Sequence, residues 1–495
     1  MNNRHISLYG VTATALLLSL QGCDHLDKPQ TPNLDIKLVN QSVNPVLAQT
    51  MPGFESANVY SLISSDDKLP QSPNFVFGGS ADGSGLLKNA DGTFTMLVNH
   101  EDNFSVSRLT FDKTLKPVKG DYILNSDGGQ WRLCSATMAT PAEHGFGPLY
   151  LTCGESGQES RTHAVNPYGD ASQNAISREL EGLGRWSAEN AVPLNKNAFP
   201  GKTAILIGDD DSGTNGGQLA LYLTNTVGDL QNGSLYMLRR RDGNAREMDM
   251  KTGAKFDVEF VQIANHKTLT GAQINAAVND LKGLKFGRVE DIDYRKGSAA
   301  NNRQVFFNVT GQANTGVNAD YSRSKYGRTY RLTMDANDPL KGSLEVILDG
   351  DDRNGIAKTF QNVDNIYVGT NYLYVQEDPN SYGDETHDSY IYQYNLATGA
   401  LKPALILDHR RTATDAAKYN VGGLSKFGTW EYGAMIDVSE TIGIPDAFII
   451  SLQPHTWIGD QYLGPDGGKL RSVKSTSDVS NQQASQLILV RGLPR

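Results

Sequence analysis

Residues 203–238 read TAILIGDDDSGTNGGQLALYLTNTVGDLQNGSLYML, and this stretch decides the expected fold class. It holds three short runs rich in aliphatic and aromatic residues, at 203–207, 219–224 and 234–238. Gly, Asn and Asp separate the runs, and these residues favour turns because they adopt turn geometry at little cost. Short apolar runs bounded by turn residues are typical of β-strands. The stretch therefore predicts three strands joined by turns.

The same pattern recurs along most of the chain. Further strands are expected at residues 93–98, 149–152, 304–308, 329–334, 344–348, 372–376, 390–394, 448–452 and 487–490. The one convincing helix is 270–281, where apolar residues share a face and Thr268 or Thr270 can cap the start. Strands and helices do not alternate regularly, which weakens the case for a parallel α/β sheet. We therefore predict an all-β fold, and a β-propeller in particular, because radial closure protects strand edges.

Length and composition exclude several classes of protein. The chain has 495 residues, a formal net charge of −10 and a sequence pI of about 5.4. A dedicated nucleic-acid binder normally carries a basic surface, so no nucleic acid is expected as a partner. The mean hydropathy of −0.42 is too polar for a multi-span membrane protein, and a hydrophobic content of 38% is too high for a disordered chain.

The first 23 residues are typical of a bacterial lipoprotein signal peptide. An apolar run at residues 8–20 follows Arg4 and is too short to span a bilayer. The run leads into Gln21-Gly22-Cys23, which resembles a lipobox, so we expect lipid attachment at Cys23. An ordinary secretory signal with a free cysteine is the alternative.

The residues after Cys23 indicate where the mature protein resides. Asp24 resembles the residue that retains lipoproteins at the inner membrane. Residues 24–45 are polar and contain proline, as a flexible tether would be. We therefore expect a periplasmic protein, held to the bacterial cell membrane only through its lipid anchor, with a single folded domain at 46–495.

Acidic clusters lie where predicted strands meet loops. Asp209, Asp210 and Asp211 follow the strand at 203–207, and Glu377 and Asp378 follow the strand at 372–376. Ca²⁺ takes six to eight oxygen ligands, and carboxylates in flexible loops supply them. Acidic residues are also common in surface turns, so each cluster has two interpretations.

Two cysteines remain in the mature chain, Cys134 and Cys153. In an oxidising compartment they can form a disulfide, and at least one can instead be a thiolate metal ligand. Their spacing leaves both possibilities open. The sequence lacks the Gly-x-Ser-x-Gly nucleophile elbow, the phosphate-binding P-loop and the His-Glu-x-x-His metalloprotease motif.

Taken in order along the chain, short motifs between about residues 78 and 455 resemble the PhoX-like alkaline phosphatase family. The matching pieces are Val98-Asn99-His100-Glu101, Cys134 with Thr140-Pro141, Leu151-Thr152-Cys153-Gly154-Glu155, Gly184-Arg185-Trp186-Ser187-Ala188-Glu189, Gly208-Asp209-Asp210, Arg288-Val289-Glu290-Asp291, Val363-Asp364-Asn365, Gln376-Glu377-Asp378, Trp430-Glu431 and Gln453-Pro454-His455. Each fragment is degenerate, and their serial order carries the resemblance.

The resemblance implies an exported β-propeller with a calcium- and iron-containing active site that hydrolyses phosphomonoesters. We expect six blades with loop and short helical insertions, a small phosphorylated substrate, and a monomer. Cys134 is expected to hold the iron pair, and Arg288 to bind two phosphate oxygens through its planar guanidinium. The carboxylates expected to supply oxygens to calcium or iron are Glu155, Glu189, Glu290 and Glu431, with Asp209, Asp210, Asp364 and Glu377 as weaker candidates.

Departures from the family pattern leave the function open. Gly154 stands where the family has a glutamate, and Ala188 where it has a histidine. These changes allow a catalytically inactive, calcium-stabilised propeller lipoprotein with a binding role. They also allow a propeller esterase or lactonase in which calcium polarises an ester carbonyl. Fold alone does not decide among these functions.

Overall fold

The computed structural model describes residues 36–495 except residues 424 and 476. The predicted signal peptide, the predicted lipid site at Cys23 and residues 24–35 of the predicted tether lie outside the described residues. The end of that tether packs against the domain: Asn44 is buried, and its side-chain amide donates to Ser64 Oγ at 2.8 Å. In the described part of the chain, no helix is long and apolar enough to cross a membrane.

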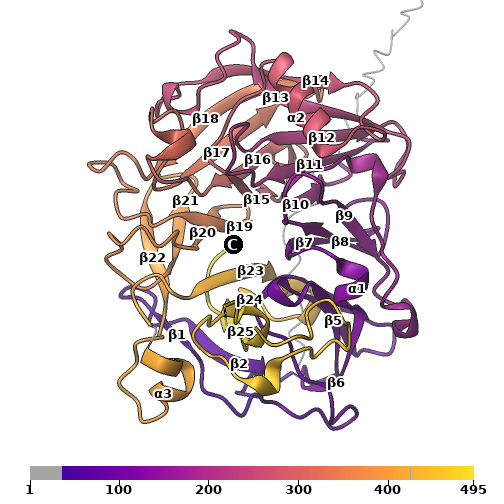
Figure 1. The fold of residues 1–495 in the computed structure, drawn as a ribbon, viewed down its shortest axis with the longest axis vertical. Helices are drawn as coiled ribbons and strands as arrows, with labels where there is room; N and C mark the ends of the chain where they lie inside the picture. The colour runs from indigo at the N-terminus through magenta and orange to yellow at the C-terminus, as the bar shows by residue number, and fades with distance from the viewer. Residues whose placement is uncertain (1–35, 424, 476) are drawn as a thin grey trace, which may run out of the picture.

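The fold is all-β and propeller-like, which confirms the predicted class (Figure 1). Antiparallel sheets surround a common axis. In most sheets the first strand in the chain lies nearest the axis, and the following strands lie successively farther from it. The first two sheets hold β3 (Ala81–Lys88), β4 (Phe94–His100), β5 (Ser105–Phe111) and β6 (Pro117–Leu124), and then β7 (Leu133–Ala139), β8 (Leu149–Gly154) and β9 (Thr162–Val165).

Two four-stranded units share the next sheet. They contain β10 (Ala188–Pro193), β11 (Thr203–Asp209), β12 (Leu219–Thr224) and β13 (Ser234–Arg240), and β15 (Val289–Tyr294), β16 (Gln304–Val309), β17 (Arg328–Met334) and β18 (Lys341–Asp349). β14 (Phe256–Ile263) pairs with both β13 and β18, so it joins the two units at their outer edges into one nine-stranded sheet. This pairing leaves neither outer edge free for another chain.

The last two sheets close the ring. One holds β19 (Val363–Val368), β20 (Tyr372–Glu377), β21 (Tyr390–Asn395), β22 (Leu401–Leu407) and β1 (Ala48–Thr50). The other holds β23 (Glu431–Asp437), β24 (Ala447–Gln453), β25 (Gln486–Arg491) and β2 (Asn58–Ser64). Each of these sheets thus adds an early strand to late ones, which fastens the two ends of the folded chain together.

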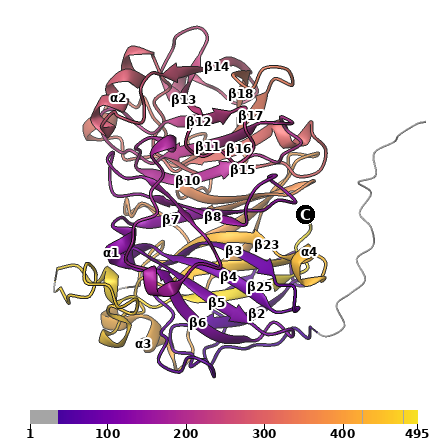
Figure 2. The same ribbon diagram turned by 90° about the vertical axis from the view of Figure 1, so that its right-hand side faces the viewer.

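The strands nearest the axis, which we call the inner strands, are β3, β7, β10, β15, β19 and β23. Each contacts the next in this order, and β23 contacts β3. The hydrophobic core lies between neighbouring sheets rather than on the axis; for example, Phe448 of β24 meets the ring of Tyr367 of β19 edge-on. Turning the view by 90° shows the sheets stacked around the axis (Figure 2).

Every strand expected from the sequence is present, and so is the helix. α2 (Gly271–Asp280) begins after Thr270, whose hydroxyl accepts the amide of Gln273 while Gln273 bonds back to the amide of Thr270. This reciprocal pair satisfies two amides that the first turn cannot bond. The other α-helices are one-turn insertions: α1 (Ser126–Gly129), α3 (Ala416–Tyr419) and α4 (Ser439–Ile442).

Candidate metal centre

Five inner strands place an acidic residue or a cysteine at the same point of a β-bulge. The bulges interrupt the pairing of β3, β7, β10, β15 and β19 with the next strand of each sheet. A bulge sets two residues against one and re-aims the side chain that it inserts. The first residues within these bulges are Asp82, Cys134, Glu189, Glu290 and Asp364. In β23 the corresponding residue is Gly433, and Glu431 stands two residues earlier.

A second set of acidic residues comes from the strand beside each inner strand. Glu101, Glu155, Asp210 and Asp378 directly follow the last residues of β4, β8, β11 and β20. In an antiparallel pair, the end of one strand lies beside the start of the other. The hairpin geometry therefore brings these carboxylates to the end of the axis where the bulged residues lie.

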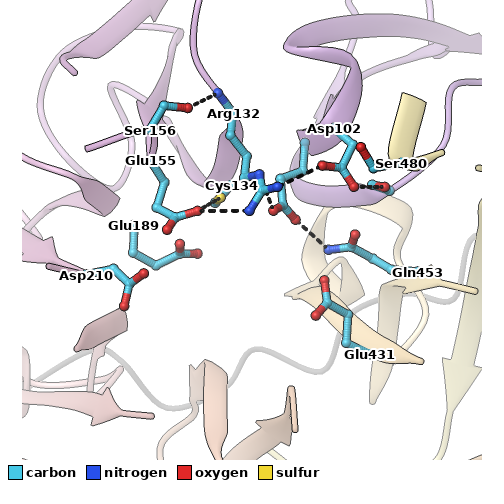
Figure 3. Close-up of polar contacts among 12 residues, drawn as sticks. Asp102, Arg132, Cys134, Glu155, Ser156, Glu189, Asp210, Glu431, Gln453 and Ser480 are labelled. Carbon is cyan, nitrogen blue, oxygen red and sulfur yellow. Dashed lines mark hydrogen bonds and ion pairs between the residues drawn. The ribbon is translucent and has the colours of Figure 1, made fainter. Parts of the chain in front are cut away.

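The side chains form a continuous cluster. Three groups each have ligand atoms within 4.8 Å of one another, and the groups share Cys134 and Glu189. Figure 3 shows Cys134, Glu155 and Glu189 turned toward one another. We call the members the acidic cluster: Asp82, Glu101, Cys134, Glu155, Glu189, Glu290 and Asp364. The sequence predicted all of these as ligands except Asp82 and Glu101.

Arg288 lies against the cluster at its β15 side. Its guanidinium forms ion pairs with Asp210 at 2.7 Å and Glu290 at 3.3 Å, and it donates to Asn380 Oδ1 at 2.6 Å. The residue has a left-handed backbone with φ of 73°, which is rare for a side chain of this size. Asp210, another predicted ligand, therefore reaches the site as the partner of Arg288.

Arg132 lies on the side of Cys134 that is opposite to Arg288. Its guanidinium contacts Glu101 at 3.2 Å, Asp102 at 3.1 Å and Glu155 at 4.0 Å. Figure 3 shows this side chain between Glu155 and Asp102. Arg132 and Arg288 carry two positive charges against a cluster of six carboxyl groups and a thiol. The remaining negative charge must be neutralised by protons or by bound cations.

Burial dominates the electrostatics of the cluster. Removal from water raises the pKa of Glu189 to about 8, and neighbouring Asp291 and Asp210 add to the effect. Burial, followed by the charges of nearby carboxylates, raises the pKa values of Glu155 and Asp364 well above the ordinary range. The pKa of the Cys134 thiol is raised for the same reasons, and its Sγ donates to Glu155 Oε2 at 3.3 Å. Without a cation, the cluster therefore holds protons at neutral pH.

The donor atoms suit metal ions. Asp82 Oδ1 and Asp364 Oδ1 are buried and have no hydrogen-bond partner among the residues that the structure describes. Buried polar atoms without a partner are rare in folded proteins, and a bound ion can satisfy them. Calcium favours carboxylate oxygens, whereas a thiolate favours softer transition metals such as iron. The oxygen-rich cluster with one sulfur thus fits both predicted metals.

A second layer of polar residues holds the acidic cluster in place through hydrogen bonds. Ser135 donates its backbone amide to Glu189 Oε1 at 3.1 Å, and its hydroxyl accepts from Asn365 at 2.7 Å. Asn190 donates to Asp291 Oδ1 at 2.5 Å. These residues directly follow Cys134, Glu189, Glu290 and Asp364, so the same bulges position both layers. Such supporting bonds hold metal ligands in their orientation.

Three other predicted ligands lie elsewhere. Glu431 is buried and faces His455 at 3.4 Å across the axis from Glu155, but it is outside the acidic cluster (Figure 3). Asp209 accepts the amide of Ser187 at 3.0 Å. Glu377 accepts the amide of Tyr390 at 2.9 Å and bonds His387 at 3.0 Å.

Strand alternation explains why Asp209 and Glu377 miss the cluster. Successive side chains of a strand point to opposite faces. Asp209 ends β11 and Glu377 ends β20, so the following residues, Asp210 and Asp378, take the direction of the axis instead. The sequence predicted Asp209 and Asp210 of the first pair as ligands but only Glu377 of the second, whereas in each pair it is the second member that takes the direction of the axis.

The cysteines are not joined. Both are free and buried, and Cys153 Sγ faces Thr162 Oγ1 at 3.4 Å on the other side of the hairpin. The alternative of a Cys134–Cys153 disulfide is therefore wrong. Cys134 remains available as a ligand, and Cys153 packs in the core with Leu151 and Trp186.

Comparison with known proteins gives matches among solved structures, all of low sequence identity in the examples below. No family model and no curated protein matches the chain. The α-L-arabinanase of Penicillium chrysogenum, complexed with arabinobiose, is 10% identical with a TM-score of 0.37, over 89% of this chain and 98% of that one. A putative glycosidase of Bacteroides thetaiotaomicron is 11% identical with a TM-score of 0.28, over 73% and 96%. Polysaccharide lyase Uly1 is 8% identical with a TM-score of 0.33, over 85% and 92%.

The prediction of phosphomonoester hydrolysis, and with it of an alkaline phosphatase, is wrong on these findings. The similar structures are described as an arabinanase, a glycosidase and a polysaccharide lyase, and none of the three is described as a phosphatase. Their TM-scores are too low for their activities to be carried over to this chain. The resemblance of motif order to PhoX-like proteins stays a prediction.

Proposed function

We propose that the protein is a metal-dependent hydrolase that works at the acidic cluster. One observation carries the proposal: carboxylates from several sheets and one cysteine form three linked groups, each with ligand atoms within 4.8 Å of one another, and the guanidinium groups of Arg132 and Arg288 oppose their charge. A fold gains no stability from gathering buried carboxylates of one sign. Such an arrangement is typical of sites that bind cations and use them in catalysis.

We propose six blades around this site. The cyclic contacts of the inner strands support this number, because each inner strand begins one sheet or one half of the nine-stranded sheet. β14 then counts as an added edge strand that joins two blades. The arrangement gives each of five blades one residue of the cluster, at its bulge.

We propose calcium and iron as the metals. Cys134 with Glu155 and Glu189 would hold iron, since this group contains the sulfur. Glu189 with Glu290 and Asp364 would hold calcium, since this group offers only oxygen. Bound cations would supply Lewis-acid polarisation of the scissile bond and neutralise the charge that develops there.

The chain's own residues would then bind and orient the substrate. Arg288 is held by Asp210, Glu290 and Asn380, so its guanidinium is fixed in place without a ligand. It can donate a hydrogen bond to an electronegative oxygen of the substrate. Ser135 keeps Glu189 from turning away, because its amide holds one carboxylate oxygen. These fixed donors and acceptors reduce the reorganisation needed during reaction.

Glycoside hydrolysis by carboxylates alone is the second candidate. Glu189, Glu290 and Asp364 have oxygens within 4.8 Å of one another, and the pKa of Glu189 is raised to about 8 by burial. Retaining glycosidases hold a protonated acid and a carboxylate at about 5 Å. Glu189 would be the acid, because its proton is retained at neutral pH.

One experiment separates the candidates. Purified protein is analysed for calcium and iron, and is then assayed on chromogenic carboxylic esters and aryl glycosides with and without EDTA. The metal-dependent proposal expects bound metal and hydrolysis that EDTA abolishes. Glycoside cleavage that survives EDTA would favour the second candidate. Bound calcium without any hydrolysis would instead favour the non-enzymatic binding protein.

We also propose that the protein is exported and lipid-anchored at Cys23, and that it acts as a periplasmic monomer. The apolar run at residues 8–20 and the lipobox-like ending support export and lipidation. Metabolic labelling with a fatty acid tests the anchor, and Cys23→Ser should abolish the label. Labelling that persists in this variant would contradict lipid attachment at Cys23.

A further inference from the structure

Arg132 lies beside Cys134 and contacts two carboxylates of the acidic cluster (Figure 3). Its Nε lies 3.2 Å from Glu101 Oε1, and its Nη1 lies 4.0 Å from Glu155 Oε2. That same Glu155 oxygen accepts from Cys134 Sγ at 3.3 Å. The guanidinium therefore neutralises two carboxylates that flank the thiol, and both belong to the acidic cluster.

The two arginines at the site differ in how firmly they are held. Arg288 is 21% exposed and bonds an amide oxygen as well as carboxylates. The side chain of Arg132 is 44% exposed, and its side-chain contacts at this position are with carboxylates. A half-exposed guanidinium on a long, flexible stem can leave carboxylates that a metal ion takes over.

We propose that Arg132 is a resident cation that competes with metal for Glu101 and Glu155 and so sets which metals the Cys134 side accepts. This inference rests on the proposed metal centre. Guanidinium and metal cannot share these oxygens without close repulsion between two positive charges. The binding energy of a metal must therefore offset the loss of the Arg132 ion pairs. This requirement disfavours weakly bound ions and favours those that also bind the thiolate strongly.

The two possible roles of Arg132 predict opposite changes in metal affinity when the residue is replaced. If Arg132 merely positioned Glu101 and Glu155, its removal would weaken metal binding. If Arg132 competes, its removal frees both carboxylates and metal binds more tightly. The neutral variant Arg132→Gln should thus bind ferrous iron, the metal proposed for the Cys134 side, roughly tenfold more tightly, the scale expected for one unit charge at a partly exposed site. Arg132→Lys keeps the charge and should stay near the wild-type affinity.

Titration of metal-free, full-length protein with ferrous iron under anaerobic conditions, by isothermal calorimetry, measures this effect. Arg185→Gln is the matched control, because Arg185 pairs with Glu159 at 3.5 Å outside the acidic cluster and has similar exposure. The control should leave the affinity for ferrous iron unchanged. Phenylglyoxal labelling gives a second readout: the rate at Arg132 should rise when ferrous iron is added, relative to the rate at Arg185, because the guanidinium is released.

The outcomes distinguish this inference from the proposed function. Equal or weaker binding of ferrous iron by Arg132→Gln, with iron bound by the wild type, would overturn the role of Arg132 but not the proposed metal centre. Absence of iron binding in the wild type and in Arg132→Gln alike would overturn both. Binding by Arg132→Gln that exceeds the wild type, without a change in Arg185→Gln, supports the competition.

Discussion

Replacement of Glu189 by glutamine should change stability in opposite directions with and without metal. Glu189 is buried at the junction of two groups of the acidic cluster. The glutamine side chain would keep an acceptor for the amide of Ser135 but would carry no charge. Without metal, the wild-type carboxyl must take up a proton when the protein folds near neutral pH. The variant has no such requirement.

The magnitude follows from the pKa. Burial raises the pKa of Glu189 from 4.5 to about 8. Its contribution to stability is therefore complete below pH 4.5 and is lost as pH rises through 8. At pH 7.5 the uptake of a proton against an unfolded pKa of 4.5 costs about 4 kcal/mol. In EDTA, Glu189→Gln should therefore gain up to about 4 kcal/mol over the wild type at pH 7.5, and almost nothing at pH 4.5.

Calcium should reverse this order. The carboxylate is then a ligand, and a bound ion stabilises the folded state in proportion to its affinity. Loss of the ligand weakens binding, so saturating calcium should stabilise the wild type more than the variant. Equilibrium urea unfolding at both pH values, with EDTA or with calcium, measures all four differences.

Glu247→Gln is the matched control. Glu247 is fully buried but lies outside the cluster, where it accepts from the Gly287 amide at 2.8 Å, the Ser324 amide at 3.1 Å and the Tyr330 hydroxyl at 3.0 Å. Its replacement breaks a satisfied network, so it should destabilise the protein equally in EDTA and in calcium. If Glu189→Gln behaves in the same way as this control, Glu189 has a structural role and the reasoning fails.

Substitutions at three further positions test other parts of the structure. Cys134→Ser should lower iron content and leave calcium in place, because serine is a poor ligand for iron; unchanged iron by elemental analysis would contradict the proposed thiolate ligand. Arg288→Gly and Arg288→Ala should both lower the catalytic rate, but Gly should be about 1 kcal/mol more stable in urea because φ at this position is 73°; equal stabilities would argue against backbone strain. His163 is fully buried, and burial lowers its pKa from 6.5 to about 4, so its contribution to stability is present above pH 6.5 and is lost as pH falls through 4. The wild type should therefore lose about 3 kcal/mol more than His163→Gln between pH 7 and pH 4, and parallel urea-unfolding profiles would refute this.

The sequence predicted the outer part of each sheet but not its innermost strand. Strands such as Leu219–Thr224 pack against core residues on each face, so most of their residues are aliphatic or aromatic and the pattern is visible. None of the inner strands was predicted. β3 contains Asp82, Gly83 and Gly85, and β10 contains Glu189 and Asn190, because these strands carry the site rather than a second layer of core. Their polar residues hide the strand signal.

The candidate site was predicted in part for a related reason. Cys134, Glu155, Glu189, Glu290 and Asp364 were named from motif order, and the structure brings them together. Asp82 was missed because an Asp between Ala81 and Gly83 is typical of a turn. Its membership follows only from the bulge in β3, which corresponds to the bulges of the other inner strands. A search for one short pattern, an apolar residue, then an acid or cysteine, then Gly, Ser, Asn or Asp, could have found it.

The way in which the site is built ties metal binding to the closure of the fold. Each group of the acidic cluster draws its residues from at least two sheets, and Glu189 and Cys134 link one group to the next. In the metal-free protein the inner strands therefore bring negative groups together at one end of the axis, where like charges oppose close approach unless protons remain bound. A cation that binds there replaces repulsion between sheets with shared coordination. The same ions that would act on a substrate would thus also hold the inner strands together. Removal of metal should therefore lower both the stability and the activity of the protein.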